Sequence, residues 1–288
     1  MTNEIGDFQD LQAKTNLIVS GSVALNFFTY NTYNDNLDPF CHLNECLTVG
    51  AWYISRKYAY RPVPPQLSSF KDEVLRVQEI VRRYSEHPTS NGLHGDVDIS
   101  STVQIWTFHN GTSTIQLFAS SCSPLEILLL FHSTCVMNVL THRAAYCFFP
   151  HLTLIENCSL LNSVNLPFSD RQLLSLVKYG QRGFYFMNMP SVFRTIDRKS
   201  ALSFFFPRSP GDRHSYKLKF IHVGSAHDSN ITIEMAILSS EFSISTQVVR
   251  LLFVVQKGEG VLIVMPALWL WMESFKDSKI YFKVDVSQ

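Results

Sequence analysis

The chain has 288 residues, of which 46% are hydrophobic and 13% are aromatic, so it can bury the core of one large domain or two small ones. Basic and acidic residues balance at 24 each, which argues against long-range steering toward nucleic acid or an acidic membrane surface. Residues 1–7 carry neither a basic region nor an apolar run, so they do not have the pattern of a secretory signal.

The longest apolar stretch, residues 125–140, is interrupted by His132 and Asn138. It falls short of the ~20 apolar residues that a membrane-spanning helix needs. The six cysteines contain no C-x-x-C pair, and we expect them to be reduced, mostly buried thiols. Together these features predict a soluble cytoplasmic protein with neither a membrane nor a nucleic-acid partner.

The first half of the chain begins with alternating strand and helix signals. In chain order we expect a buried strand, a short helix opening at Ser22, a second strand and a longer helix, over 16–20, 22–30, 36–41 and 45–58. Three prolines within 61–65 predict a loop. Apolar residues at helical spacing predict a helix over 70–84, and a polar loop follows at 86–96.

The second half begins with a hairpin, because residues 102–108 and 113–119 alternate in polarity around the turn dipeptide Asn110-Gly111. Ser123-Pro124 and Glu126 form a helix start, and the apolar run that follows predicts a central buried helix from 123 to about 141. A capping signal at Ser169 opens another helix that ends near Gly183.

Beyond residue 184 the pattern changes to alternating strands, for example at 216–220 and 280–286. The fold class is therefore α/β or α+β, with a small mixed sheet covered by helices and a strand-rich C-terminal part. We expect two regions, 1–190 and 191–288.

Four motifs, in order, carry a family resemblance: Ser20-Gly21-Ser22-Val23-Ala24-Leu25, Asp35-Asn36-Leu37-Asp38, the run from Phe131 to Asn138, and Lys178-Tyr179-Gly180-Gln181-Arg182-Gly183-Phe184. With them the chain resembles the nucleotidyltransferase superfamily of the DNA-polymerase-beta type, and more narrowly a group of uncharacterised fungal members. The resemblance covers roughly residues 15–215. It implies a domain in which a Gly-Ser turn holds phosphate and three carboxylates hold two metal ions across the reacting group.

Carried over position by position, the resemblance places the phosphate-binding turn at Gly21 and Ser22. The paired carboxylates fall on Asn36 and Asp38, and the third falls on Gln116. Only Asp38 is still a carboxylate and a full metal ligand, because amides bring no charge to a hard cation. Pro39 follows where a strand residue is expected, and it lacks the amide hydrogen that would bond to a neighbouring strand.

These departures favour a nucleotidyltransferase-fold protein with a degraded metal site, a pseudoenzyme that binds a nucleotide and transfers slowly or not at all. Mg²⁺ and a nucleoside triphosphate are the implied ligands. One alternative is an active Mg²⁺-dependent enzyme that moves a nucleotidyl group from ATP to a small molecule or a protein, with Asp38 as its ligand. A second alternative is a non-enzymatic interaction protein.

Lys178 and Arg182 lie one helical turn apart, so they either hold a triphosphate or complement the C-terminus of their helix. Three weaker candidates remain. Asp96 and Asp98 form an Asp-apolar-Asp pattern, but they lie farther from the Gly-Ser turn than the spacer of the family motif allows. Possible zinc ligands are Cys41, His42, Cys46 and His132. His132 could also serve as a base for Ser133 or Cys135, but neighbouring residues on a helix point apart, which favours a core histidine.

Overall fold

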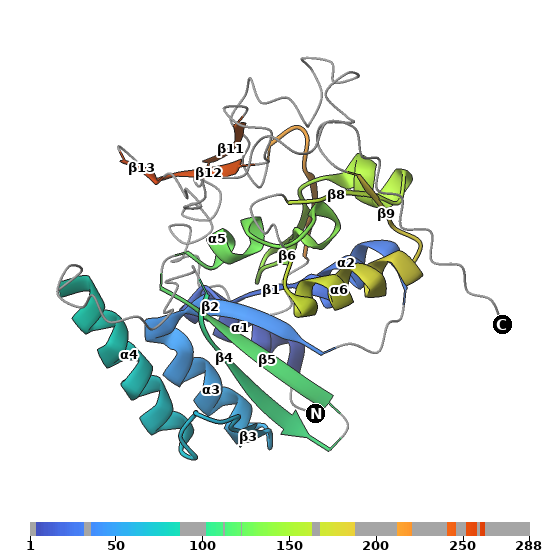
Figure 1. Cartoon of the computed structure of the whole chain (residues 1–288). Coiled ribbons are helices and arrows are strands. Elements are labelled where there is room, and N and C mark those ends of the chain that lie inside the picture. The colour runs from blue at the N-terminus through green and yellow to red at the C-terminus, as the bar shows by residue number, and fades with distance from the viewer. Residues whose placement is uncertain are drawn as a thin grey trace. The chain divides into compact units, whose positions relative to one another are not determined.

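The computed structural model describes the backbone and most side chains of residues 4–31, 36–86, 102–111, 113–121, 123–162, 168–187 and 212–220, and the backbone of 241–245, 252–257 and 260–262. Within these residues the fold is mixed α/β with several helices, as the sequence predicts, but the main mixed sheet is large, with eight strands, where a small one is expected (Figure 1). The predicted strand at 280–286 and the Asp96-Asp98 pattern lie outside the described residues. No helix in the described ranges is both long and apolar enough for a membrane span.

The chain divides into two compact units. The first comprises 1–127, 139–145 and 219–227, and the second comprises 128–138, 146–218 and 228–288. The predicted boundary at residue 190 falls outside the described residues, so the division at that point stays a prediction.

The large sheet contains eight strands. Their bounds are β1 Ile18–Ser20, β2 Asp38–His42, β3 Ala59–Arg61, β4 Thr102–Asn110, β5 Ser113–Ser120, β6 Asn138–Leu140, β7 Ala144–Cys147 and β10 Tyr216–Lys219. They lie in the order β10-β7-β6-β1-β2-β5-β4-β3. The sheet is mixed because β2 pairs antiparallel with β1 and parallel with β5.

The hairpin of β4 and β5 forms where the sequence predicts it. Asn110 pairs with Ser113 at its end, and Gly111 takes the positive φ of 54° that such a turn requires. Along β5 the side chains alternate between faces, so Ile115 and Leu117 are buried in the core while Gln116 points the other way.

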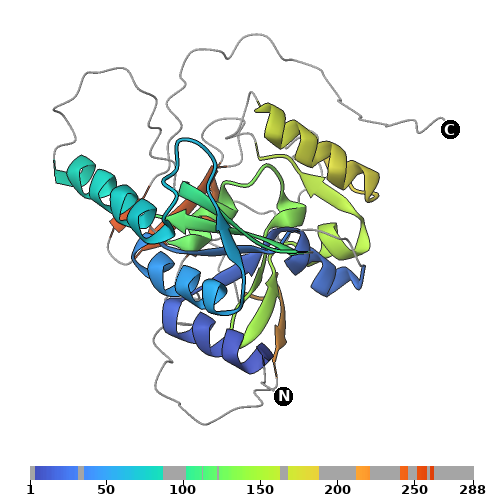
Figure 2. The ribbon, with the colours of Figure 1, turned by 90° about the horizontal axis from the view of Figure 1, so that it is seen from below.

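Four helices belong to the first unit: α1 Glu4–Thr15, α2 Gly21–Thr29, α3 Cys46–Ser55 and α4 Phe70–Glu86. The last three confirm the predicted helices to within a few residues, and a 3₁₀ turn at Leu43–Glu45 leads into α3. Helix α1 was not predicted. It is held by Gln12, whose Nε2 donates to the carbonyl oxygens of Leu17 and Leu140. In the view from below, α3 lies between α1 and α4 (Figure 2).

Helices α1, α3 and α4 and the sheet enclose the core of the first unit. Large aromatic side chains dominate it, and Phe70 contacts Trp106, Phe108 and Tyr60 with ring centroids 5.5, 5.0 and 5.3 Å apart. Tyr53 contributes a further buried ring, 5.7 Å from that of Phe108. Edge-to-face and tilted arrangements at these separations are favourable for aromatic rings.

Tyr53 gives a test of this core. Its hydroxyl is buried with no hydrogen-bond partner among the described residues, and burial raises the pKa of the phenol far above its usual range. Tyr53→Phe removes this polar atom and leaves the ring, so we expect the free energy of unfolding to rise by about 1 kcal/mol. Urea denaturation measures the change. A loss of stability would mean that the hydroxyl has a partner in solution.

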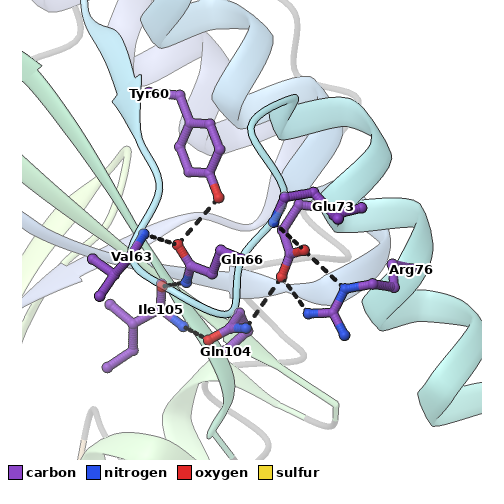
Figure 3. A network of polar contacts seen from close by, with 8 residues as sticks. Tyr60, Val63, Gln66, Glu73, Arg76, Gln104 and Ile105 are labelled. Carbon is purple, nitrogen blue, oxygen red and sulfur yellow. Dashed lines mark hydrogen bonds and ion pairs between the residues drawn. The ribbon is translucent and has the colours of Figure 1, made fainter.

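A polar network ties the loop before α4 to the helix and to β4 (Figure 3). At its centre is Glu73, whose side chain has no solvent exposure. The carboxylate accepts hydrogen bonds from Arg76 Nε and Nη2 at 2.9 and 2.7 Å and from the Leu67 amide at 3.0 Å. On the other side of the loop, Gln66 donates to the carbonyl of Ile105 at 2.8 Å. The network therefore fixes the proline-rich loop against the sheet.

Glu73 also predicts a pH dependence. Burial would raise the pKa of Glu73, but the hydrogen bonds from Arg76 and the Leu67 amide outweigh it and hold the pKa below the ordinary value of 4.5. The resulting stability is present above the unfolded-state pKa and is lost as the pH falls through the lower folded-state pKa. We expect Glu73→Gln to cost about 2 kcal/mol at neutral pH, and the difference from wild type to shrink below about pH 4.5.

Denaturant titrations of both proteins between neutral and acid pH measure this difference. Glu79→Gln is the matched control, since Glu79 lies on the same helix and also pairs with arginines, but its side chain is 40% exposed. We expect the control to change stability little at any pH. A constant difference for Glu73→Gln across the range would contradict the assignment.

The predicted helix from 123 to 141 is wrong beyond its first turns. Helix α5 spans only Pro124–Leu129, and the chain then forms a 3₁₀ turn at Thr134–Val136 before it enters β6. The segment is nearly all buried, as expected. Burial removes the polar face that would distinguish a helix from a strand, and β-branched residues such as Val139 and Thr141 favour extended backbone.

The second unit contains a small parallel pair of strands, β8 Cys158–Leu160 and β9 Tyr185–Met187. Helix α6, Asp170–Gln181, begins with the predicted capping box: the Ser169 amide donates to Gln172 Oε1 at 2.9 Å, and the Gln172 amide donates to Ser169 Oγ at 3.4 Å. A π-helical turn lies at His151–Ile155. Three further strands, β11 Glu241–Ser245, β12 Leu252–Lys257 and β13 Gly260–Leu262, form a separate antiparallel sheet.

Candidate functional site

The Gly-Ser turn lies where the sequence predicts it, between the end of β1 and the start of α2. Ser20 is extended, with φ of −139°, and Gly21 takes a φ of +67° that only glycine adopts without strain. The first amides of a helix have no partner within it, and they carry its positive partial charge. Ser20, Gly21 and Ser22 are all buried.

Asp38 lies directly against this helix start. In the antiparallel register of β1 and β2, Asp38 is the partner of Ser20. Its Oδ2 atom would be only 2.8 Å from a Cβ placed on Gly21, and its Oδ1 atom is shielded from solvent. A carboxylate at the N-terminus of a helix is stabilised by the helix dipole. The carboxylate that the sequence singles out is thus in contact with the turn that the sequence assigns to phosphate.

Gln116 lies beside Asp38 on the neighbouring strand. In the parallel register Phe40 pairs with Phe118, and the residues two positions earlier are Asp38 and Gln116. Their side chains leave the sheet on the face opposite Ile115, as do the rings of Phe40 and Phe118, which stack with centroids 4.4 Å apart. Asp38 and Gln116 therefore lie on adjacent strands with their side chains on the same side of the sheet.

Asn36 precedes the strand and is exposed. The residue between it and Asp38 is Leu37, whose amide donates to Thr114 O and whose carbonyl accepts from the Gln116 amide. This pairing holds the chain extended, so alternation directs Asn36 to the face of Asp38. Pro39 comes next in the same ladder and has no amide to donate, yet the strand continues through it to His42.

The donors assembled at this site are one carboxylate and two neutral amides. Within the described ranges, no three histidine, cysteine, aspartate or glutamate side chains come together as a metal site. Divalent hard cations draw much of their affinity from carboxylate charge. The donor set therefore does not fit the arrangement of three carboxylates and two metals that the resemblance implies.

Lys178 and Arg182 belong to the second unit, at the C-terminal end of α6. Lys178 Nζ and Arg182 Cζ each lie 5.0 Å from the centroid of the Tyr179 ring, so both cations are held by the same aromatic side chain. Cations at this end of a helix also complement its dipole. Since Asp38 and Gly21 are in the first unit, the meeting of the two groups at one triphosphate stays a prediction.

His132 and Ser133 do meet, contrary to the argument that neighbouring residues point apart on a helix. The segment is not helical at Ser133, where φ is −163°, and Ser133 Oγ lies 2.8 Å from His132 Nδ1. Burial and the nearby charge of Lys178 lower the pKa of His132 to about 4. Ser133 is fully buried, and Cys135 beside it is buried with its pKa raised to about 11. His132 is therefore a buried, neutral histidine whose contact with Ser133 is structural.

The proposed zinc ligands do not converge. His42 Nδ1 accepts a hydrogen bond from the Asn44 amide, and its Nε2 donates to the carbonyl of Ser121, both at 3.2 Å. Both ring nitrogens are therefore in use. The sulfur atoms of Cys41 and Cys46 are in contact with each other, 3.4 Å apart.

Two features of the first unit were missed in the sequence. The contact of Asp38 with Gly21 depends on the pairing of β1 with β2, and no local pattern encodes it. The buried Glu73 did leave a signal, since it lies three residues after Phe70 and four before Val77 on the apolar face of α4. A charge at such a position needs partners within the protein.

Comparisons with known proteins add no further assignment: no family model matches the chain, and neither the curated proteins nor the solved structures contain a significant match.

Proposed function

We propose that this chain is a nucleotidyltransferase-fold protein whose metal site is degraded, and that it binds a nucleoside triphosphate but transfers a nucleotidyl group slowly or not at all. The observation that carries the proposal is the contact between Asp38 and the start of α2. A strand, a Gly-Ser turn with a positive φ, a helix and a second strand bearing a carboxylate come together in the order that this chemistry uses.

The weakness of the transfer follows from the donor set. Asn36 and Gln116 offer neutral carbonyl oxygens where two carboxylates would hold the metal ions. A cation held by Asp38 and amides stabilises the charge of a transferring phosphate less than the full site does. In this proposal Lys178 and Arg182 supply positive charge to the triphosphate, and the protein acts in the cytoplasm.

Titration calorimetry with each nucleoside triphosphate, with and without Mg²⁺, tests the binding. We expect one triphosphate to bind, and expect Mg²⁺ to improve its affinity only slightly. Lys178→Ala with Arg182→Ala should weaken binding at least tenfold. Arg171→Ala is the matched control, because Arg171 is an exposed cation at the opposite end of the same helix.

Restoring the carboxylates tests the degraded site directly. We expect Asn36→Asp with Gln116→Asp to raise the affinity for Mg²⁺ at least tenfold, since both positions flank Asp38 on one face of the sheet. Asn110→Asp with Ser113→Asp adds the same two charges at the β4–β5 turn and should leave the Mg²⁺ affinity unchanged. An equal gain in Mg²⁺ affinity in both variants would mean that the restored carboxylates do not bind Mg²⁺ together with Asp38.

The two alternatives are separate outcomes of these experiments. Transfer of labelled nucleotide from ATP by the unmodified chain, abolished by Asp38→Asn, would establish an active Mg²⁺-dependent enzyme. Absence of binding for every nucleoside triphosphate, in the unmodified and the restored chain, would contradict the proposal and favour a non-enzymatic interaction protein that keeps the fold.

A further inference from the structure

Two buried cysteines of the first unit lie in direct contact. Cys41 is on β2 and Cys46 is the first residue of α3, and their Sγ atoms are 3.4 Å apart. Both side chains have no solvent exposure. The chain between them is His42, the last residue of β2, and the 3₁₀ turn Leu43–Glu45, which returns the backbone so that the two sulfur atoms meet.

The sulfur atoms of a disulfide bond are about 2.05 Å apart. By that comparison the two sulfurs must approach each other by less than about 1.5 Å to form the bond. The surroundings are the aromatic and aliphatic core that also contains Tyr53 and Phe108. A disulfide carries no charge and needs no hydrogen bond, so this environment accepts it.

The described residues hold no cluster of three histidine, cysteine, aspartate or glutamate side chains that would complete a metal site at the two sulfurs. Burial together with the neighbouring Cys41 thiol raises the pKa of Cys46 well above its usual range, so this thiol is protonated in the reduced protein. His42, the nearest candidate for a third ligand, has both ring nitrogens in hydrogen bonds. Oxidation to a neutral product is the chemistry that fits these two thiols.

We propose that Cys41 and Cys46 are a redox modification site, which forms an intrachain disulfide bond when the protein equilibrates with a low-molecular-weight disulfide such as oxidised glutathione. The proposal is independent of nucleotide binding. Cys41 lies three residues after Asp38 on the same strand, so the bond would join the strand of the candidate site covalently to the start of α3.

The reaction balances as thiol–disulfide exchange. One cysteine, exposed by local opening of the Leu43–Glu45 turn, loses its proton and attacks oxidised glutathione; it forms a mixed disulfide and releases one glutathione thiolate, which takes up a proton. The second cysteine then loses its proton and displaces the other glutathione in the same way. The two cysteines are oxidised by two electrons, and one glutathione disulfide is reduced to two thiols. Because both sulfurs are buried and protonated, the reaction is slow and must be followed to equilibrium.

The test uses the full chain in buffers with rising ratios of oxidised to reduced glutathione, incubated to equilibrium and quenched by alkylation under denaturing conditions. The chain has six cysteines, and we expect two fewer alkylated thiols at the oxidising end. Before alkylation, the oxidised chain should be lighter than the reduced chain by two hydrogen atoms. A protease specific for glutamate cuts the bond between Glu45 and Cys46. The peptides that contain Cys41 and Cys46 should remain joined until a reductant is added, and the Tm of the oxidised chain should rise.

Cys46→Ala should abolish the linked peptides, whereas Cys135→Ala, which removes a buried thiol of the second unit, should leave them unchanged. The peptide map of the unmodified chain decides the matter even if a variant does not fold. Recovery of both Cys41 and Cys46 as free thiols at the oxidising end would overturn the proposal. So would their recovery as separate glutathione adducts, or a bond from either one to a different cysteine.

Discussion

Gly50→Ala is expected to lower the free energy of unfolding by about 3 kcal/mol or more, the largest single-methyl effect we derive. Gly50 lies in α3 against Phe70, the first residue of α4, and a Cβ added there would be 2.0 Å from Cε1 of the Phe70 ring. The ring cannot easily move, because Tyr60, Trp106 and Phe108 surround it. The clash therefore outweighs the gain of about 1 kcal/mol that alanine gives over glycine within a helix.

Gly180→Ala is the control for helix propensity. Gly180 also lies within a helix, but an added Cβ would meet only Phe186 at 3.9 Å, an ordinary contact. This variant should gain up to about 1 kcal/mol. Phe70→Leu should recover part of the loss in Gly50→Ala, which a double-mutant cycle measures. If Gly50→Ala is neutral in urea denaturation, the helices are not packed as closely as described.

Gly21→Ala is expected to cost about 3 kcal/mol and to weaken binding of a nucleoside triphosphate. Two effects add. Alanine at a φ of +67° carries about 1–2 kcal/mol of backbone strain. Its methyl group would also lie 2.8 Å from Asp38 Oδ2, so the carboxylate must move away from the helix start. Urea denaturation measures the first consequence and calorimetry the second.

The two effects can be separated with a matched variant. Gly111 has a similar φ of +54°, but nothing lies within 4 Å of its Cβ position, so Gly111→Ala measures backbone strain alone. We expect Gly111→Ala to cost about 1 kcal/mol and to leave nucleotide binding unchanged. Equal losses in the two variants would mean that Asp38 does not contact the turn.

Local signals predicted those elements whose cause is local. The hairpin at Asn110-Gly111 and the capping box at Ser169 need only their own few residues, and both formed where expected. Helix α1 escaped notice because Ile5, Phe8 and Leu11 form a weak stripe, and Ile5 remains 74% exposed. Strand β3 is only three residues long and adjoins the prolines, so it has no pattern of its own.

Features that depend on distant parts of the chain could not be predicted in the same way. The apolar run after Ser123 fits a buried helix and a buried strand equally well, and only its neighbours in the fold decide between them. For the site, the family motif, carried over position by position, placed Asp38 and Gln116 on adjacent strands, and the strand register puts their side chains on one side of the sheet. That Asp38 touches Gly21 depends on strand register, which the sequence does not display.

The parallel pairing of β2 with β5 has a consequence for folding kinetics. The β4–β5 hairpin closes over a few residues, whereas β2 reaches β5 only by joining Phe40 to Phe118, far along the chain. Closing a long loop costs more entropy than closing a short one, so contacts between distant residues form later. We therefore expect the seam between β2 and β5 to close after the hairpin. Pro39 also withholds one amide from it. Asp38 and Gln116 are neighbours across the seam, so the candidate site forms only after the hairpin has closed.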